Sequence, residues 1–218
     1  MSRITAREGC RHAPPPRVRE ASASGRADRA GPRRIVKLHT AVPDIEIQQA
    51  DVYAHFMDEL YDELPQAEEI FAKANVRKRR FAMSPRQYQQ GYPSLGPRMR
   101  AWETHAVDLS HRAMKELITD VDTDDIGTLV MVSSTGYTNP GPDVSLARLF
   151  GLRSTLRRSF IGHMGCYAAF NGLKVALDAV AARPTERAVV GCVELSSLHM
   201  RNEVTVEQAV AHALFGDA

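Results

Sequence analysis

Hydrophobic residues follow two alternating patterns along most of this chain. From residue 35 onward, short runs of β-branched and other apolar residues alternate with longer stretches in which an apolar residue recurs every three or four positions. The short runs are typical of strands, and the longer stretches are typical of amphipathic helices. Their alternation predicts an α/β fold built as a layered sandwich, in one domain that covers residues 35–218.

The short runs predict four strands. Residues 128–133 and 187–194 are largely apolar, which is typical of strands buried on both faces. Gly and Pro residues after position 133 end the first of these runs. A further strand is expected at residues 35–42, ended by Pro43, and a short one at residues 159–161.

Helical periodicity predicts the elements between these strands. Residues 45–64 place an apolar side chain at every fourth position from Val52 onward. Residues 84–100, rich in Pro, Gly and Gln, are expected to run irregularly over the surface. The helix predicted at residues 167–182 has an apolar stripe formed by Phe170, Leu173, Leu177 and Val180. Further helices are predicted at residues 68–74, 102–118, 144–150 and 206–214.

The first 34 residues differ in composition from the rest. They carry nine arginines against Glu8, Glu20 and Asp28, a net charge of +6, whereas the rest of the chain carries −4. Arginine clusters can neutralise nucleic-acid phosphates, and an Arg-rich leader containing Ser superficially resembles a transit peptide. The near absence of large apolar residues instead favours a disordered extension at residues 1–34, and no nucleic-acid partner is expected.

The apolar runs and the cysteines exclude several classes of protein. The longest apolar runs, at residues 129–132 and 188–193, are far shorter than the roughly 20 residues that cross a bilayer. Arginines and prolines interrupt any secretory signal, so we expect a cytoplasmic protein without a membrane partner. Cys10, Cys166 and Cys192 show no CxxC spacing, which predicts reduced thiols and no metal site.

Cys166 is the strongest candidate for chemistry. It stands between the strand predicted at residues 159–161 and the helix predicted at residues 167–182. The positive end of a helix dipole and its free N–H groups favour a thiolate there, and they can also hold an oxyanion during acyl transfer. Judged from the residues alone, a buried structural cysteine is the alternative, because most free cysteines are small core residues.

Five segments carry a family resemblance. They are residues 133–143 (Ser-Ser-Thr-Gly-Tyr-Thr-Asn-Pro-Gly-Pro-Asp), 149–153 (Leu-Phe-Gly-Leu-Arg), 165–169 (Gly-Cys-Tyr-Ala-Ala), 193–198 (Val-Glu-Leu-Ser-Ser-Leu) and 213–217 (Ala-Leu-Phe-Gly-Asp). In order and spacing they resemble type III polyketide synthases, the chalcone/stilbene synthase family. The resemblance extends over roughly residues 35–218 and corresponds to the N-terminal half of such an enzyme.

The resemblance implies a fold and a reaction. The fold is a thiolase-like αβαβα layered fold, here incomplete because only its N-terminal half is present, and the family forms homodimers. The reaction is an acyltransferase reaction, the iterative decarboxylative condensation of malonyl-CoA onto an acyl-CoA starter. Cys166 would carry the growing chain as a thioester, and CoA thioesters would be substrates with no further cofactor.

The resemblance also implies binding residues. Phe215 falls on the aromatic gatekeeper between the CoA tunnel and the cavity, although a lone Phe is usually a core residue. Ser134 and Ser196 match hydroxyl positions that line the cavity. Judged as residues alone, they would be ordinary serines of a turn or a strand end. Lys78 and Arg80 lie in a basic run that resembles the CoA entrance, where cations suit phosphates. Asn139 replaces a methionine of plant members, which leaves the starter preference open.

The activating residues of the family are expected outside this chain. In the family a histidine and an asparagine of the C-terminal half activate the cysteine and promote decarboxylation. Among the histidines present, His199 is the candidate for lining the cavity, and a Cys166–His199 dyad is conceivable. Half of a duplicated fold should expose an apolar face. Because the activating residues belong to the C-terminal half, we expect the chain alone to be inactive. A separate C-terminal half is a possible partner.

Two other functions fit the same residues. A β-ketoacyl-ACP synthase III-like condensing enzyme shares the fold, the cysteine and a Gly-Asp motif, but the loop at residues 139–142 and the stretch at residues 194–196 favour the polyketide family. A non-catalytic partner that binds CoA esters or completes another subunit is the alternative from a different class. Within the polyketide family, the long-chain bacterial alkylresorcinol or alkylpyrone type is favoured by residues 165–169 and by Leu198 and His199.

Overall fold

A three-stranded parallel sheet organises the part of the chain that carries Cys166. A computed structural model describes residues 33–89 and 94–218. In it, β3 (Ile126–Val132) lies between β4 (Arg157–Ile161) and β5 (Arg187–Cys192). Val130 of β3 is in register with Ser159 on one side and with Val190 on the other. The carboxyl ends of all three strands therefore meet at one edge of the sheet.

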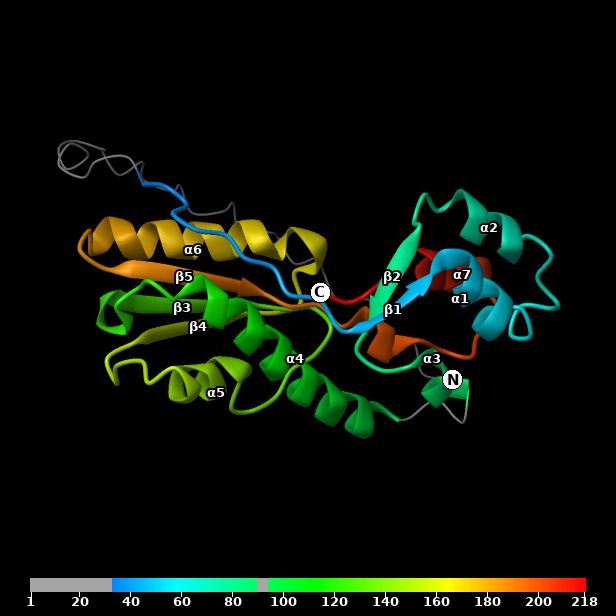
Figure 1. The fold of residues 1–218 in the computed structure, drawn as a ribbon, viewed down its shortest axis with the longest axis horizontal. Helices are drawn as coiled ribbons and strands as arrows, with labels where there is room; N and C mark the ends of the chain where they lie inside the picture. The colour runs from blue at the N-terminus through cyan, green and yellow to red at the C-terminus, as the bar shows by residue number, and fades with distance from the viewer. Residues whose placement is uncertain (1–32, 90–93) are drawn as a thin grey trace, which may run out of the picture. The chain divides into compact units, whose positions relative to one another are not determined.

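Helices cover both faces of this sheet (Figure 1). The helix α6 (Ala168–Ala182) packs against β3 and β5 on one face, and α4 (Leu95–Leu117) and α5 (Pro142–Leu149) lie on the other. Side chains alternate along β3, so that Val130 and Val132 join the cluster under α6 while Leu129 and Met131 join the main core. Burial on both faces explains why β3 is apolar at nearly every position.

A two-stranded antiparallel ribbon forms the second group of elements. The strands β1 (Ile45–Gln48) and β2 (Lys78–Phe81) pair with Ile45 opposite Phe81. Between them lie α1 (Gln49–Val52), a π-helical segment (Tyr53–Met57) and α2 (Ala67–Lys73). The helix α7 (Val206–Leu214) packs against α2, and α3 (Pro85–Gln89) follows β2.

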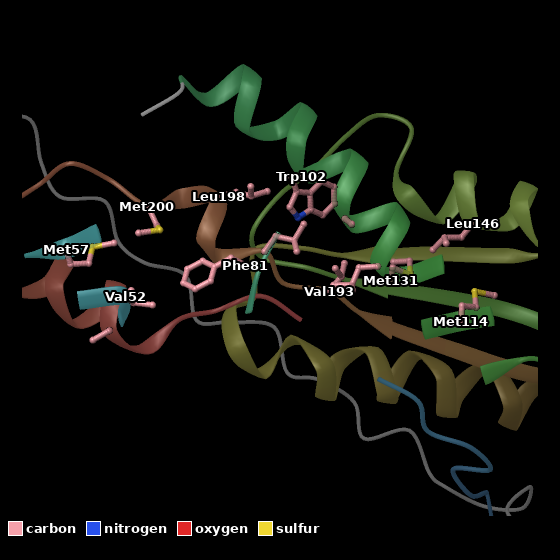
Figure 2. Close-up of a cluster of buried hydrophobic side chains, with 14 of the residues drawn as sticks. Val52, Met57, Phe81, Trp102, Met114, Met131, Leu146, Val193, Leu198 and Met200 are labelled. Atoms are coloured by element: carbon pink, nitrogen blue, oxygen red, sulfur yellow. The ribbon is translucent and has the colours of Figure 1, made fainter. Parts of the chain in front are cut away.

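One hydrophobic core joins the ribbon to the sheet. Trp102 of α4, Phe81 of β2 and Leu198 are fully buried members of one cluster that also contains Leu129 of β3. Figure 2 shows Trp102, Phe81, Leu198 and Val193 as side chains of this cluster, contributed by different elements. Packing of this cluster is what fixes the loops after β3 and β5 relative to β2.

Two predictions about the first described residues are wrong. Residues 35–42 form no strand, and residues 33–40 are exposed; in the described part of the chain no neighbouring strand offers them backbone partners. Residues 45–64 are not one helix, because Ile45–Gln48 pairs with β2 as a strand and helical structure covers only residues 49–57. Long-range pairing has overridden local periodicity at residues 45–48, whereas residues 35–42 lack a partner strand in the described part of the chain.

Residues 84–100 contain more helix than their composition predicts. The helix α3 lies within them, and α4 begins at Leu95, well before the predicted start at Trp102. Pro97 stands in the first turn of α4, where a missing N–H costs no intrahelical hydrogen bond. The predicted leader lies outside the described residues, except for residues 33 and 34.

The remaining predicted helices and strands are confirmed, and their ends differ from the predicted ends by only a few residues. The predicted helix at residues 206–214 has the bounds of α7, and Gly151 ends α5 with a left-handed backbone at φ 59°. The strands at residues 128–133, 159–161 and 187–194 are confirmed as β3, β4 and β5. No helix in residues 33–89 and 94–218 is both long enough and apolar enough to span a bilayer.

The apolar stripe predicted on α6 does not face the sheet. Phe170 is 67% exposed and Leu177 is 48% exposed, and Leu173 lies on the same outer side. The sheet instead meets a face of small residues, Ala168, Gly172 and Ala176. A helix with an apolar stripe on the side away from its sheet is typical of a helix buried between two layers. The exposed stripe on α6 therefore agrees with the apolar face that half of a duplicated fold is expected to leave uncovered.

Candidate functional site

Cys166 lies in a single 3-10 turn, Gly165–Tyr167, which leads directly into α6. The turn follows β4 by way of two residues with left-handed backbones, His163 at φ 59° and Gly165 at φ 72°. This geometry reverses the chain sharply at the carboxyl edge of the sheet. Cys166 is exposed there, so its thiol is accessible to a reactant.

The electrostatic setting of Cys166 follows from this placement. The first N–H groups of a helix have no intrahelical acceptors, and the helix dipole is positive at that end. Cys166 therefore stands at the end of α6 where the partial positive charge of the helix lies. The same groups can stabilise an oxyanion on a carbonyl carbon under attack by the sulfur.

Cys192 has a different environment. It ends β5 and is exposed like Cys166, but partial burial of its thiol raises the thiol pKa, with the carboxylate of Glu194 adding to the shift. Both causes disfavour the thiolate. Of the two cysteines in the described residues, Cys166 is therefore the one placed for nucleophilic chemistry.

The turn after β3 lies directly beside the Cys166 turn. The hydroxyl Oγ of Ser134 accepts a hydrogen bond from the backbone N–H of Gly165 at 3.1 Å. The N–H of Ser134 in turn donates to Oε1 of Glu194 at 2.8 Å. Ser134 thus lies beside the turn that carries Cys166. Glu194 was not identified from the sequence as a site residue, and its place at the end of the strand predicted at residues 187–194 was the available signal.

His199 is held by the same turn and not by Cys166. Its ring Nε2 hydrogen-bonds the carbonyl oxygen of Thr135, so Nε2 carries the hydrogen. Thr135 Oγ1 also accepts from the N–H of Leu195 at 2.9 Å. Within the described residues no hydrogen bond joins the sulfur of Cys166 to a histidine ring. The conceivable Cys166–His199 dyad is therefore not formed in this structure.

Phe215 lies at the end of α7 and is 51% exposed. Its carbonyl accepts from Nη1 of Arg79 at 3.0 Å, and the same guanidinium donates to the carbonyl of His212. Gln49 Nε2 donates to the carbonyl of Ala213 at 2.9 Å. Arg79 and Gln49 thus bind the carbonyls that the last turn of α7 leaves without partners. They fix the backbone from which the Phe215 ring projects.

The basic run at residues 77–80 divides between two faces of β2. Lys78 and Arg80 lie on the outer face, where both pair with Glu46 of β1, at 2.9 Å for Lys78. The hydrogen bond from Lys78, followed by the charges of both cations, lowers the pKa of Glu46. Arg79 points into the core because strand side chains alternate. It lies over the rings of Phe71 and Phe81, and burial lowers its pKa to about 10.

Asp217 lies two residues after Phe215, and its side chain is hydrogen-bonded to the turn that carries Ser196. Its carboxylate accepts from the N–H and hydroxyl of Ser197 and from the N–H of Ala82 at 2.7 Å. Burial raises its pKa, although these hydrogen bonds act in the opposite direction. Ser196 is half-buried in the 3-10 turn Ser196–His199.

Two open hollows lie elsewhere on the described surface. The larger, of about 760 Å³, lies between the end of β2 and α4 and includes Ser84, Arg100 and His105. The smaller, of about 400 Å³, lies between α2 and α7. Neither is lined by a predicted site residue. In residues 33–89 and 94–218, no group of His, Cys, Asp and Glu side chains is placed to hold a metal ion.

Residues 19–218 match the family model described as chalcone and stilbene synthases, N-terminal domain. The chain is 33% identical over 192 residues to the alpha-pyrone synthesis polyketide synthase-like Pks18 of Mycobacterium tuberculosis, covering 83% of this chain and 48% of that protein. Among solved structures, PKS-I of the brown alga Ectocarpus siliculosus is 31% identical with a TM-score of 0.74, covering 83% of this chain and 52% of that one.

A bacterial type III polyketide synthase has the same fold. The 1,3,6,8-tetrahydroxynaphthalene synthase of Streptomyces coelicolor A3(2) is 24% identical, with a TM-score of 0.75, and the match covers 82% of this chain and 53% of that one. The chain therefore spans about half the length of the relatives that it matches. The structural agreement extends over most of the residues from the ribbon to α7.

Proposed function

Because the chain belongs to the chalcone and stilbene synthase family, whose N-terminal domain it matches, we propose that it supplies the nucleophilic half of a type III polyketide synthase. Its thiolase-like fold places Cys166 at the carboxyl edge of the parallel sheet and at the start of α6. The exposed thiol at that helix start is the observation that carries the proposal. Cys192, whose thiol pKa is raised, does not have this setting.

The proposed reaction begins with transfer of an acyl group to Cys166. The thiolate attacks the carbonyl carbon of an acyl-CoA starter, a carbon–sulfur bond forms, and the bond to CoA sulfur breaks. CoA leaves as a thiolate and takes up the proton that Cys166 gave up. Malonyl-CoA then loses CO₂, and its enolate carbon attacks the enzyme thioester. Cys166 returns to a thiolate, and the lengthened chain remains on CoA.

The CoA ester and the growing chain would contact groups on both sides of the site. Ser134, adjacent to the Cys166 turn, and Ser196 present hydroxyls for the intermediate, and His199 lines the same loops. Phe215, exposed at the end of α7, would offer its ring as the gatekeeper that the resemblance implies. Lys78 and Arg80 offer cations for phosphates, and Glu46 holds them in place until a phosphate competes for them. The substrates themselves are CoA thioesters, and no other cofactor enters this proposal.

The outer stripe of α6 supports a second part of the proposal. Its exposed Phe170, Leu173 and Leu177 match the apolar surface that a second layer would bury. We assign that layer to the half of the fold that the longer relatives possess, whether it continues this chain or is a separate polypeptide. The complete enzyme would act as a homodimer in the cytoplasm. The chain without that half would not condense substrates, because the thiol would lack its activating partners.

A condensation assay tests this proposal. The isolated chain is given an acyl-CoA and malonyl-CoA, and products are identified by mass spectrometry. We expect no polyketide from the chain alone and polyketide when the half that covers α6 is supplied. Normal polyketide turnover by the isolated chain would contradict the proposal. Malonyl groups carried on acyl-carrier protein serve as the control, because preferential use of that substrate would favour a β-ketoacyl-ACP synthase III-like enzyme.

A further inference from the structure

We infer that Ser134 is a positioning residue for Cys166, and that Glu194 acts through it by fixing the Ser134 backbone. The inference rests on the proposed function, because it concerns the same thiol. The Ser134 hydroxyl joins the turn after β3 to the backbone N–H that immediately precedes Cys166, at 3.1 Å from Gly165 N. A role in holding the thiol differs from the cavity-lining role that the sequence predicts for this serine.

The Cys166 turn requires an external support. His163 and Gly165 both have left-handed backbones, at φ 59° and 72°. The left-handed backbone is costly for His163, which has a side chain, and it persists there only where surrounding contacts hold it, whereas Gly165 adopts it without steric cost. Gly165 has no atom near the position that its Cβ would occupy, so side-chain packing does not hold this residue. The hydrogen bond to Ser134 therefore restrains the residue before Cys166 from outside the turn.

The Ser134 hydroxyl is itself held in place from β5. Glu194 Oε1 accepts the Ser134 N–H at 2.8 Å, and Thr135 Oγ1 accepts the Leu195 N–H at 2.9 Å. The His199 ring donates to the carbonyl of Thr135. These bonds fix the backbone on both sides of the Ser134 side chain. A continuous series of contacts thus runs from the end of β5, through the turn after β3, to the residue before Cys166.

The first arm of the test measures the rate of hydrogen exchange at the Gly165 amide. Hydrogen exchange at Gly165 is followed by NMR in the isolated chain and in two variants of matched shape, Ser134→Thr and Ser134→Val. Threonine keeps the hydroxyl and valine replaces it with a methyl group. We expect Gly165 to exchange at least about fivefold faster in Ser134→Val than in Ser134→Thr, the effect of losing one hydrogen bond. Equal exchange in the two variants would overturn the inference.

The second arm measures the reactivity of the thiol. In a Cys10→Ser, Cys192→Ser background, Cys166 is the remaining cysteine, and its rate of alkylation by iodoacetamide at pH 7 reports on that residue alone. We expect Ser134→Val to slow alkylation by about threefold or more, because the sulfur loses its alignment with the N–H groups at the helix start. Ser134→Thr should restore the rate. An unchanged or faster rate in Ser134→Val would overturn the positioning role.

Controls separate this inference from a general loss of structure and from the proposed function. Ser154→Ala removes an exposed hydroxyl in the turn before β4 and should alter neither measurement. Glu194→Ala should accelerate Gly165 exchange, since it removes the acceptor of the Ser134 N–H. Acyl transfer to the thiol is measured separately with an acyl-CoA. Failure of acyl transfer with normal Ser134 effects would contradict the enzyme proposal alone, and the converse result would contradict the positioning role alone.

Discussion

Gly172 of α6 packs so closely against Val132 of β3 that a Cβ at position 172 would lie 2.9 Å from Val132 Cγ2. The same atom would lie 3.2 Å from Val190 Cγ1 of β5. These distances are shorter than ordinary contacts between carbon atoms. The small face of α6 is therefore what allows the helix that starts at the Cys166 turn to lie close to the sheet.

Gly172→Val should destabilise the chain through this contact. The added side chain meets Val132 and Val190, and overpacking of this kind costs about 1–3 kcal/mol. We expect the free energy of unfolding in urea to fall by about 2 kcal/mol. Ala181→Val is the matched control, because position 181 is exposed on the same helix and should cost only about 0.5 kcal/mol. Equal losses in the two variants would contradict the packing described.

Charged substitutions on the outer stripe of α6 should leave the isolated chain folded. Phe170→Glu and Leu177→Lys alter exposed positions, so each should change the free energy of unfolding by no more than about 0.5 kcal/mol. Both variants should bind less of a hydrophobic dye such as ANS. In the complete synthase the same variants should prevent assembly. A loss above about 2 kcal/mol in the isolated chain would show that this stripe is already buried.

The stability of the chain should fall between about pH 6.5 and pH 4 because of His212. Its Nε2 accepts the N–H of Arg201 at 3.3 Å, so Nδ1 carries the hydrogen and donates to Tyr61 Oη at 2.8 Å. Burial, and then the charge of Arg79, lowers the pKa of His212 from 6.5 to about 4. In this window the unfolded chain binds a proton that the folded ring does not bind, so unfolding is favoured as pH falls.

His212→Gln tests that dependence. We expect the wild-type free energy of unfolding to fall by roughly 3 kcal/mol more than that of the variant between pH 7 and pH 4. The raised pKa of Asp217 acts in the opposite direction, since its folded form retains a proton at a higher pH than the unfolded chain. Both proteins contain Asp217, so their difference isolates His212. Parallel pH profiles would mean that folding does not lower the pKa of His212.

Asp217 should contribute strongly to stability through the loop that it fixes. Asp217→Ala leaves the buried N–H of Ser197 and the half-buried N–H of Ala82 without their acceptor. Unsatisfied buried donors cost about 1–3 kcal/mol each, so we expect a loss of about 3 kcal/mol by thermal unfolding. Asp217→Asn keeps an acceptor oxygen and should lose less. A smaller loss for alanine than for asparagine would be inconsistent with this role.

The sequence predicted the elements whose cause is local or fully buried. The apolar run of β3, the glycine after α5 and the periodicity of α7 each specify an element by themselves. The strand β1 was missed because its partner β2 lies about thirty residues away, and pairing decides its conformation. In α6 the larger apolar residues were correctly identified as a stripe, but only packing shows that small residues face the sheet.

The candidate site was predictable in part. The place of Cys166 between a strand and a helix follows from the pattern around it, and the resemblance singled out Ser134 as a cavity residue without placing it beside the Cys166 turn. The roles of Glu194 and Arg79 depend on hydrogen bonds between segments far apart in the chain. Alternation along the strand Lys-Arg-Arg-Phe could have separated Arg79 from Lys78 and Arg80, but only if those residues had been identified as a strand.

Acylation of Cys166 is the measurement that tests the central claim most directly. The chain, supplied with the half of the fold that covers α6, is incubated with an acyl-CoA and digested. The masses of the peptides that contain Cys166 and Cys192 are then measured by mass spectrometry, with Cys166→Ala and Cys192→Ser as matched variants. We expect the mass of one acyl group on the Cys166 peptide, retained in Cys192→Ser and absent from Cys166→Ala. An acyl group found on Cys192 instead, or none on Cys166, would contradict the assignment of this thiol as the nucleophile.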